Sequence, residues 1–118
     1  MANIMIVDDA AFMRNMLKDI LMEGGHNVVG EAANGIEAIK NIKKCNPDIV
    51  TLDITMPEMD GLTCLSTLKE LCPDVKIIMI SALGQQKVVV DSIQSGAVDF
   101  IIKPFQKDRI LEIINNHI

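Results

Sequence analysis

Residues 49–52 read Ile-Val-Thr-Leu, a short run that is apolar at almost every position rather than at every second one. A strand with one face in water alternates apolar and polar residues. A near-continuous apolar run is instead typical of a parallel sheet that helices cover on both faces. Four further runs lie at residues 4–7, 27–29, 77–80 and 98–102, and the weakest of them, 27–29, suits an edge strand.

Longer stretches with a helical period separate these runs. In the first, apolar residues from Met13 to Leu21 recur at the spacing of one helix face, and Arg14 is assigned to the opposite, polar face. Asn34 and Glu37 resemble a capping box at the start of the second helix. The helical stretches are predicted at residues 13–21, 34–45, 62–72, 85–95 and 107–116. This strict alternation predicts an α/β fold, (βα)5, with a doubly wound, five-stranded parallel sheet.

The length of 118 residues predicts a single domain over residues 1–118, and the composition is that of a globular protein. Apolar residues make up 49% of the chain, and 11 Lys and Arg against 16 Asp and Glu give a net charge of −5. This acidic balance argues against binding to nucleic acid or to a membrane surface, because both need clustered basic side chains. No apolar run approaches the ~18 residues of a membrane span. The chain does not open on a secretion signal, so we expect a cytoplasmic protein.

Polar side chains capable of chemistry follow four of the predicted strands. They are Asp8 and Asp9 after the first strand, Asp53 at the end of the third, Ser81 after the fourth and Lys103 after the fifth. Ligands of an open α/β sheet bind beyond the carboxyl ends of its strands, so we expect these groups to converge. Three carboxylates repel one another, and that repulsion can be offset either by a raised pKa that keeps one of them neutral or by a hard cation such as Mg²⁺. Such a site is suited to handling a phosphoryl group.

The motifs around these residues are similar to those of response-regulator receiver domains, in the order and spacing of that family. The matching segments are residues 6–9 (IVDD), 52–53 (LD), 56–61 (MPEMDG), 81–82 (SA) and 103–105 (KPF). Residues 12–14 (FMR) and 84–86 (GQQ) resemble the single-domain chemotaxis members in finer detail. The resemblance implies a flavodoxin-like sheet with the strand order 2-1-3-4-5.

The resemblance also implies a role for each acidic residue. Asp53 would be the nucleophile that accepts a phosphoryl group from a CheA-like histidine kinase. Mg²⁺ would be bound directly by Asp9 and Asp53, through water by Asp8, and by the backbone carbonyl of Thr55. Lys103 would pair with a phosphoryl oxygen.

Further residues would connect the phosphoryl group to a response. Ser81 would turn inward to hydrogen-bond the group, and the aromatic ring of Phe100 would fill the space that this movement vacates. Thr55 and Leu83 occupy the family's variable positions beside the phosphoryl group, where they would set its lifetime. The bond between Lys103 and Pro104 would be cis, as it is in the family.

The family's output surface is the face formed by the fourth and fifth helices and the fifth strand. Ser81 stands where the family often has Thr, and Phe100 where it often has Tyr, so the coupling to this face would be looser. Gln85 and Gln86 stand where better-known relatives carry Lys, and Ile113 is assigned to this face, which together favour an apolar contact with a partner over an acidic one. The residues assigned to this face are Val88, Val89, Ile93, Phe100 and Ile113. The implied partners of this monomer are the kinase, a motility motor switch protein or its adaptor, and a possible phosphatase.

Several alternatives stay open at this stage. Asp8 and Asp9 could simply cap the first helix, since acids favour a helix N-terminus. A phosphorelay intermediate would pass the group from Asp53 to a histidine carrier. A small Mg²⁺-dependent phosphohydrolase is disfavoured, because Thr55 replaces its general acid–base aspartate. We therefore predict a regulator that catalyses its own phosphorylation and dephosphorylation and no other reaction. His26 has no carboxylate or cysteine at ligand spacing, nor has His117, and both are expected at the surface.

Overall fold

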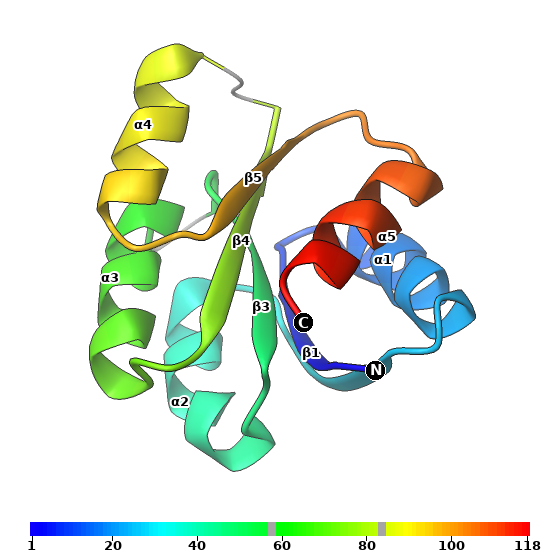
Figure 1. Ribbon diagram of the computed structural model, residues 1–118. Coiled ribbons are helices and arrows are strands. Elements are labelled where there is room, and N and C mark those ends of the chain that lie inside the picture. Colours follow the sequence, from blue (N-terminus) through cyan, green and yellow to red (C-terminus); the bar gives the residue numbers. More distant parts are fainter. Residues whose placement is uncertain (57–58, 83–84) are drawn as a thin grey trace.

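A computed structural model describes residues 1–56, 59–82 and 85–118 of the chain. Strands and helices alternate along it (Figure 1). The strands are β1 (Asn3–Val7), β2 (Asn27–Ala32), β3 (Ile49–Asp53), β4 (Lys76–Ser81) and β5 (Asp99–Ile102). The helices are α1 (Ala11–Glu23), α2 (Gly35–Cys45), α3 (Gly61–Leu71), α4 (Gln86–Gln94) and α5 (Lys107–Asn116). The strands form one parallel sheet in the order β2-β1-β3-β4-β5, which confirms the predicted fold and strand order.

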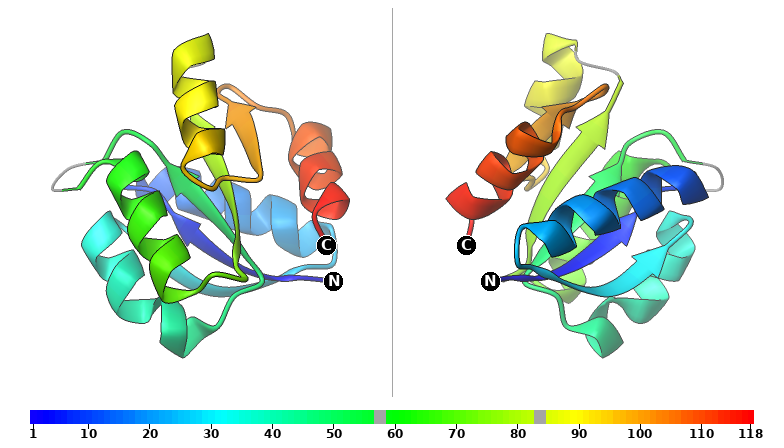
Figure 2. Two further views of the ribbon diagram at one scale, coloured as in Figure 1. Left: turned by 60° about the vertical axis from the view of Figure 1, so that its left-hand side comes forward. Right: turned by 90° about the vertical axis from the view of Figure 1, so that its right-hand side faces the viewer.

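Helices cover both faces of this sheet (Figures 1 and 2). One apolar core packs α1 and α5 against the sheet, with Leu17, Leu21 and Ile110 among its fully buried side chains. The other core packs α2, α3 and α4 against the opposite face. Every residue of the central strand β3 is buried, whereas β2 at one edge is exposed at alternate positions. Burial on both faces is the reason why the β3 sequence is nearly continuous in apolar residues.

Helix α2 begins with the predicted cap. The backbone N–H of Glu37 donates to Oδ1 of Asn34 at 2.9 Å. The Glu37 carboxylate reaches back to accept the backbone N–H of Ala33 at 3.2 Å. Helix α1 differs, because its N-cap is Ala10 and no side chain caps it. Asp8 and Asp9 therefore do not serve as helix caps, and that alternative for the acidic pair is wrong.

Both histidines are less exposed than their sequence context predicts. The His26 side chain is 5% exposed, and its Nδ1 accepts the backbone N–H of Ala2 at 3.1 Å. The ring of His117 is half-buried, with Nε2 2.9 Å from Oδ2 of Asp99. The expectation of a surface position is wrong for His26, which is buried, whereas His117 is half-buried with its ring beside a carboxylate distant in sequence.

The hydroxyl group of Thr51 has a testable energetic cost. It is buried in the middle of β3, and it has no hydrogen-bond partner within the described part of the chain. A buried hydroxyl without a partner destabilises a fold by about 1–3 kcal/mol. We expect the isosteric change Thr51→Val to raise the free energy of unfolding by about 1 kcal/mol. Urea unfolding followed by circular dichroism would measure this.

Thr67→Val is the matched control for that measurement. The Thr67 hydroxyl donates to the backbone carbonyl of Thr63 at 3.1 Å within α3, so its replacement removes a hydrogen bond that is made. This variant should gain no stability. A loss of stability in Thr51→Val would show that its hydroxyl group has a partner in solution.

Candidate functional site

Three carboxylates meet at the carboxyl ends of the central strands. Val7 of β1 lies opposite Leu52 of β3, so the residues that follow, Asp8 and Asp53, emerge from neighbouring strands side by side. Oxygen atoms of Asp8, Asp9 and Asp53 all lie within 4.8 Å of one another. Asp8 and Asp53 are buried, whereas Asp9 is exposed. The three acids predicted from sequence thus form one cluster.

Lys103 brings a positive charge to this cluster. Its Nζ lies 3.2 Å from Oδ2 of Asp8 and 3.8 Å from Oδ2 of Asp53, and its side chain is 19% exposed. The backbone N–H of Lys103 donates to the carbonyl of Ser81 at 2.8 Å, and Ser81 itself is buried at the end of β4. The peptide bond between Lys103 and Pro104 is cis, which confirms the prediction. Residues after four strands therefore converge at one edge of the sheet.

Asp8 is held through each of its polar groups. Its backbone N–H donates to the carbonyl of Ala32 at 3.1 Å, and its own carbonyl accepts from Nη1 of Arg14 at 2.6 Å. Its Oδ1 accepts the backbone N–H of Ala10 at 2.9 Å, while Oδ2 faces Lys103. These contacts fix the turn between β1 and α1 that carries Asp8 and the exposed Asp9.

Arg14 is a contributor to this site that the sequence pattern missed. Helical periodicity assigns it to the polar face of α1, but its side chain is 19% exposed and turns back toward the preceding turn. Long side chains in a helix point toward its N-terminus, so an arginine in the first turn can reach the residues before it. That direction is the signal in the sequence that could have identified it.

The site disfavours negative charge on Asp53. Burial, as the largest cause, raises the pKa of the Asp53 carboxyl from 3.8 to about 6. Lys103 opposes this rise in the pKa, whereas the neighbouring carboxylates of Asp8 and Asp9 add to it. The backbone N–H of Thr55, 3.4 Å from Oδ1, also lowers the pKa of Asp53. One lysine does not offset three crowded acids, so a cation that binds here would be favoured.

The start of α3 lies directly against the backbone of the Asp53 segment. The N–H of Gly61 donates to the carbonyl of Ile54 at 2.7 Å. A Cβ atom added to Gly61 would lie 2.5 Å from the carbonyl oxygen of Asp53 and 2.5 Å from the Cα of Ile54. This close approach explains why glycine stands at the first position of the helix.

The structure corrects the predicted output surface. Ile113 is 1% exposed, because helical periodicity places it with Ile110 and Ile114 on the face of α5 that packs on the sheet. Its assignment to an exposed face is wrong. Phe100 is 8% exposed and belongs to the core on the α4 side, and Val88 and Val89 pack against that core. The large exposed apolar residues of α4 and β5 are Val90, Ile93 and Ile102. Leu83 lies outside the described residues.

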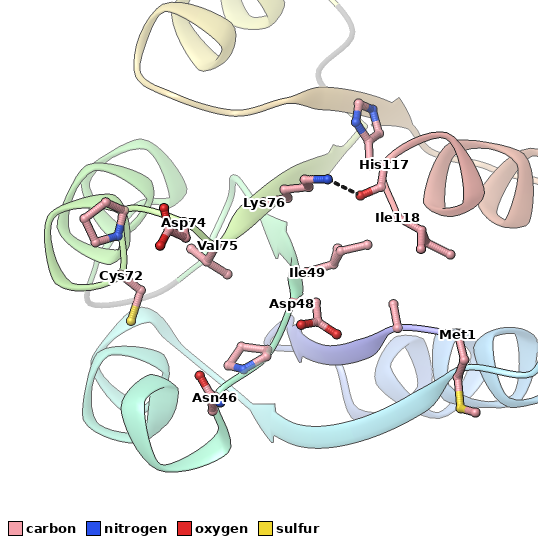
Figure 3. A pocket seen from close by; sticks show the side chains of 13 residues that line it. Met1, Asn46, Asp48, Ile49, Cys72, Asp74, Val75, Lys76, His117 and Ile118 are labelled. Atoms are coloured by element: carbon pink, nitrogen blue, oxygen red, sulfur yellow. Dashed lines mark hydrogen bonds between the residues drawn. The ribbon is translucent and has the colours of Figure 1, made fainter.

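A cavity of about 560 Å³ opens at the other end of the sheet (Figure 3). Asp48 and Lys76, beside the amino ends of β3 and β4, line it together with His117. Oδ2 of Asp48 accepts the N–H of Asn3 at 2.9 Å, and Nζ of Lys76 donates to the carbonyl of His117 at 2.7 Å. Both charged side chains thus make hydrogen bonds to the backbone of segments distant in sequence. The cavity lies at the end of the sheet opposite the acidic cluster.

None of the helices in the described parts of the chain is long and apolar enough to cross a membrane.

Comparisons with known proteins bear on the acidic site. A family model described as "Response regulator receiver domain" matches residues 4–115. The chemotaxis protein CheY of Bacillus subtilis is 60% identical over 112 residues, covering 95% of this chain and 93% of that protein. CheY of Thermotoga maritima is 54% identical, with the same two coverages of 95% and 93%.

A solved structure matches the fold in detail. It is the CheX–CheY–BeF3–Mg²⁺ complex of Borrelia burgdorferi, matched with a TM-score of 0.93 and 44% sequence identity. The match covers 97% of this chain and 87% of that one.

Proposed function

Because this chain belongs to the response regulator receiver domain family, we propose that it is a phospho-acceptor switch of bacterial or archaeal chemotaxis. Asp53 accepts a phosphoryl group from a CheA-like histidine kinase. The observation that carries this proposal is the convergence of three carboxylates and Lys103 at the carboxyl edge of the sheet. The high identity to CheY proteins over almost the whole chain supports chemotaxis as the pathway.

The donor set of the site fits Mg²⁺. Carboxylate oxygens within 4.8 Å of one another are hard ligands, and Mg²⁺ needs few of them because it keeps several waters. Asp9 and Asp53 would bind the ion directly, Asp8 through water, and Thr55 through its backbone carbonyl. When bound, the ion offsets the charge of the phosphoryl oxygens.

The residues of the chain supply the rest of the transfer. A carboxylate oxygen of Asp53 forms a bond to phosphorus as the bond from phosphorus to the donor histidine breaks, and the imidazole leaves with its electron pair. The ammonium group of Lys103 pairs with an oxygen of the bound phosphoryl group, which carries a charge of about −1.5 to −2 near neutral pH. Thr55 is exposed beside Asp53, so its side chain controls the access of water and thereby the phosphoryl lifetime. Leu83 is assigned the same role.

Phosphorylation is expected to act through Ser81 and β5. Ser81 binds the phosphoryl group, and its carbonyl already accepts the N–H of Lys103, so the two residues shift together. Phe100, two residues before the end of β5, is buried in a core against which Val88 and Val89 of α4 pack. The proposed rearrangement is a change in the packing of this ring, to which α4 responds.

The response reaches a motor switch protein or its adaptor through the exposed apolar residues of α4 and β5. Val90 and Ile93 of α4 are 42% and 45% exposed, and Ile102 of β5 is 52% exposed. An apolar contact suits these side chains better than an ion pair. The Borrelia complex of CheY with CheX supports a second protein, such as a phosphatase, as a further partner. We expect the protein to act as a cytoplasmic monomer.

Labelling by a small phosphodonor tests the proposed function. With acetyl phosphate and Mg²⁺, intact mass should show one phosphoryl group per chain, and borohydride reduction should map it to Asp53. Removal of Mg²⁺ by chelation should abolish the labelling. Asp48→Asn, a carboxylate change at the opposite end of the sheet, should label like the wild type. Label on another residue, or repeated hydrolysis of phosphomonoesters, would overturn the proposal.

A further inference from the structure

A chain of polar contacts runs outward from the backbone of the acidic site. Nη1 of Arg14 donates to the carbonyl of Asp8 at 2.6 Å, and its Nε lies 3.5 Å from Oε1 of Glu31 on β2. The second carboxylate oxygen of Glu31 lies 3.7 Å from Nζ of Lys18, one turn further along α1. The guanidinium group thus bridges the turn after β1 to the neighbouring strand.

The contact to Asp8 matters because Asp9 has no comparable support. The Asp9 side chain is exposed and makes no hydrogen bond or ion pair among the described residues. Its position relative to Asp53 is therefore set by the backbone of the turn. The Asp8 carbonyl belongs to the peptide group that links Asp8 to Asp9. By donating to this carbonyl, Arg14 holds the backbone between the two acids.

We propose that Arg14 is a positioning residue for the cation site, which fixes the peptide group between Asp8 and Asp9 and is itself oriented by Glu31. The inference rests on the proposed function, because it assumes that Mg²⁺ binds at these acids. Outer contacts that orient metal ligands commonly contribute about ten- to a hundredfold to metal affinity. The planar guanidinium can serve two acceptors at once, which the ammonium group of a lysine does less well.

Charge and positioning predict opposite effects for the loss of Arg14. A cation near three carboxylates competes electrostatically with Mg²⁺, so if Arg14 acted through its charge alone, its removal would tighten Mg²⁺ binding. If Arg14 positions the turn, its removal weakens Mg²⁺ binding despite that electrostatic gain. The sign of the change in Mg²⁺ affinity therefore separates the two roles. A role of Arg14 confined to folding would leave the Mg²⁺ affinity of the folded protein unchanged.

Mg²⁺ titration of the full chain by calorimetry tests the inference, with Mn²⁺ electron paramagnetic resonance as a second readout. The chain has no Trp or Tyr, so intrinsic fluorescence is not suitable. We expect Arg14→Ala and Arg14→Gln to bind Mg²⁺ about tenfold more weakly than the wild type. Arg14→Lys, which keeps the charge, should also bind more weakly. Circular dichroism at the same temperature would verify that each variant is folded.

Two further variants complete the test. Glu31→Asp keeps the negative charge but shortens the side chain that holds Arg14, so weaker Mg²⁺ binding in this variant would report positioning rather than charge, and the effect should be smaller than in the Arg14 variants. This variant keeps the test valid if changes at Arg14 unfold the protein. Arg109→Ala removes an exposed guanidinium that pairs with Glu112 on α5, a helix that carries none of the three acids. This variant should leave Mg²⁺ binding unchanged.

The outcomes distinguish this inference from the proposed function. Wild-type protein that does not bind Mg²⁺ would overturn both. Wild-type binding with unchanged or tighter binding in Arg14→Gln would overturn the positioning role and leave the proposed function intact.

Discussion

Asp53→Asn is expected to make the Mg²⁺-free protein more stable while it loses phosphoryl acceptance completely. The Asp53 carboxylate is buried beside two other acids, and its pKa is raised from 3.8 to about 6. Above that pH the folded state must carry a charge that the unfolded chain carries more easily. One pKa unit corresponds to about 1.4 kcal/mol, so a neutral amide should raise the free energy of unfolding by up to about 3 kcal/mol.

The effect should depend on pH in a defined direction. Because the folded pKa of Asp53 lies above the unfolded value, the proton that it binds favours the folded state at low pH. That contribution is fully present below about pH 3.8 and is lost as the pH rises through about 6. The stability advantage of Asp53→Asn should therefore be small near pH 4 and reach its full size near neutral pH.

Urea unfolding in chelator, followed by circular dichroism at several pH values, would measure this advantage. Asp74→Asn, an exposed acid at the other end of the sheet, is the control and should change stability little at any pH. Added Mg²⁺ should stabilise the wild type more than Asp53→Asn, and so reduce the difference between them in the free energy of unfolding. An advantage that is independent of pH, or a destabilised variant, would contradict the electrostatic account of the site.

Gly61→Ala is expected to destabilise the protein strongly, although alanine is the better helix former by about 1 kcal/mol. The new Cβ would lie 2.5 Å from backbone atoms of both Asp53 and Ile54. Backbone atoms cannot rotate away as a side chain does, so either α3 or the Asp53 segment must move. We expect a loss of about 3 kcal/mol in the free energy of unfolding, at the upper end of overpacking effects.

Chemical denaturation of Gly61→Ala against Ser66→Ala provides the comparison. Ser66 is exposed in the middle of the same helix, where alanine meets no backbone clash and should be neutral or slightly stabilising. Because the clash involves the segment that carries Asp53, the yield of phosphoryl labelling should fall in Gly61→Ala as well. Unchanged stability would mean that α3 can shift away from β3 at little cost.

The sheet and the acidic cluster could be predicted from sequence because simple periodicities determine them. Residues 49–52 are buried on both faces, so the whole run is apolar, and the acids follow the carboxyl ends of parallel strands. The family resemblance assigns Ile113 to the output face, although its own helical spacing places it in the core. The same periodicity, applied to α1, places Arg14 on the polar face.

Contacts made by long or buried polar side chains lie beyond such patterns. The direction of helical side chains predicts that Arg14 points toward the preceding turn, but its flexible chain of methylene groups leaves open which group of that turn it contacts, here the Asp8 carbonyl. His26 is buried because its ring accepts the amide of Ala2, a partner 24 residues away. Such pairings depend on which strands become neighbours, so they can be known only once the sheet is assembled.

The cavity at the amino end of the sheet has a practical consequence. Met1 and Ile118 both line it, and the two chain ends lie near one another in every view (Figures 1 and 2). Fluorescent or affinity tags joined to either terminus would project from the pole opposite Asp53. Tagged protein should therefore remain accessible to a kinase or a phosphodonor, which makes fusions suitable for following this regulator in living cells.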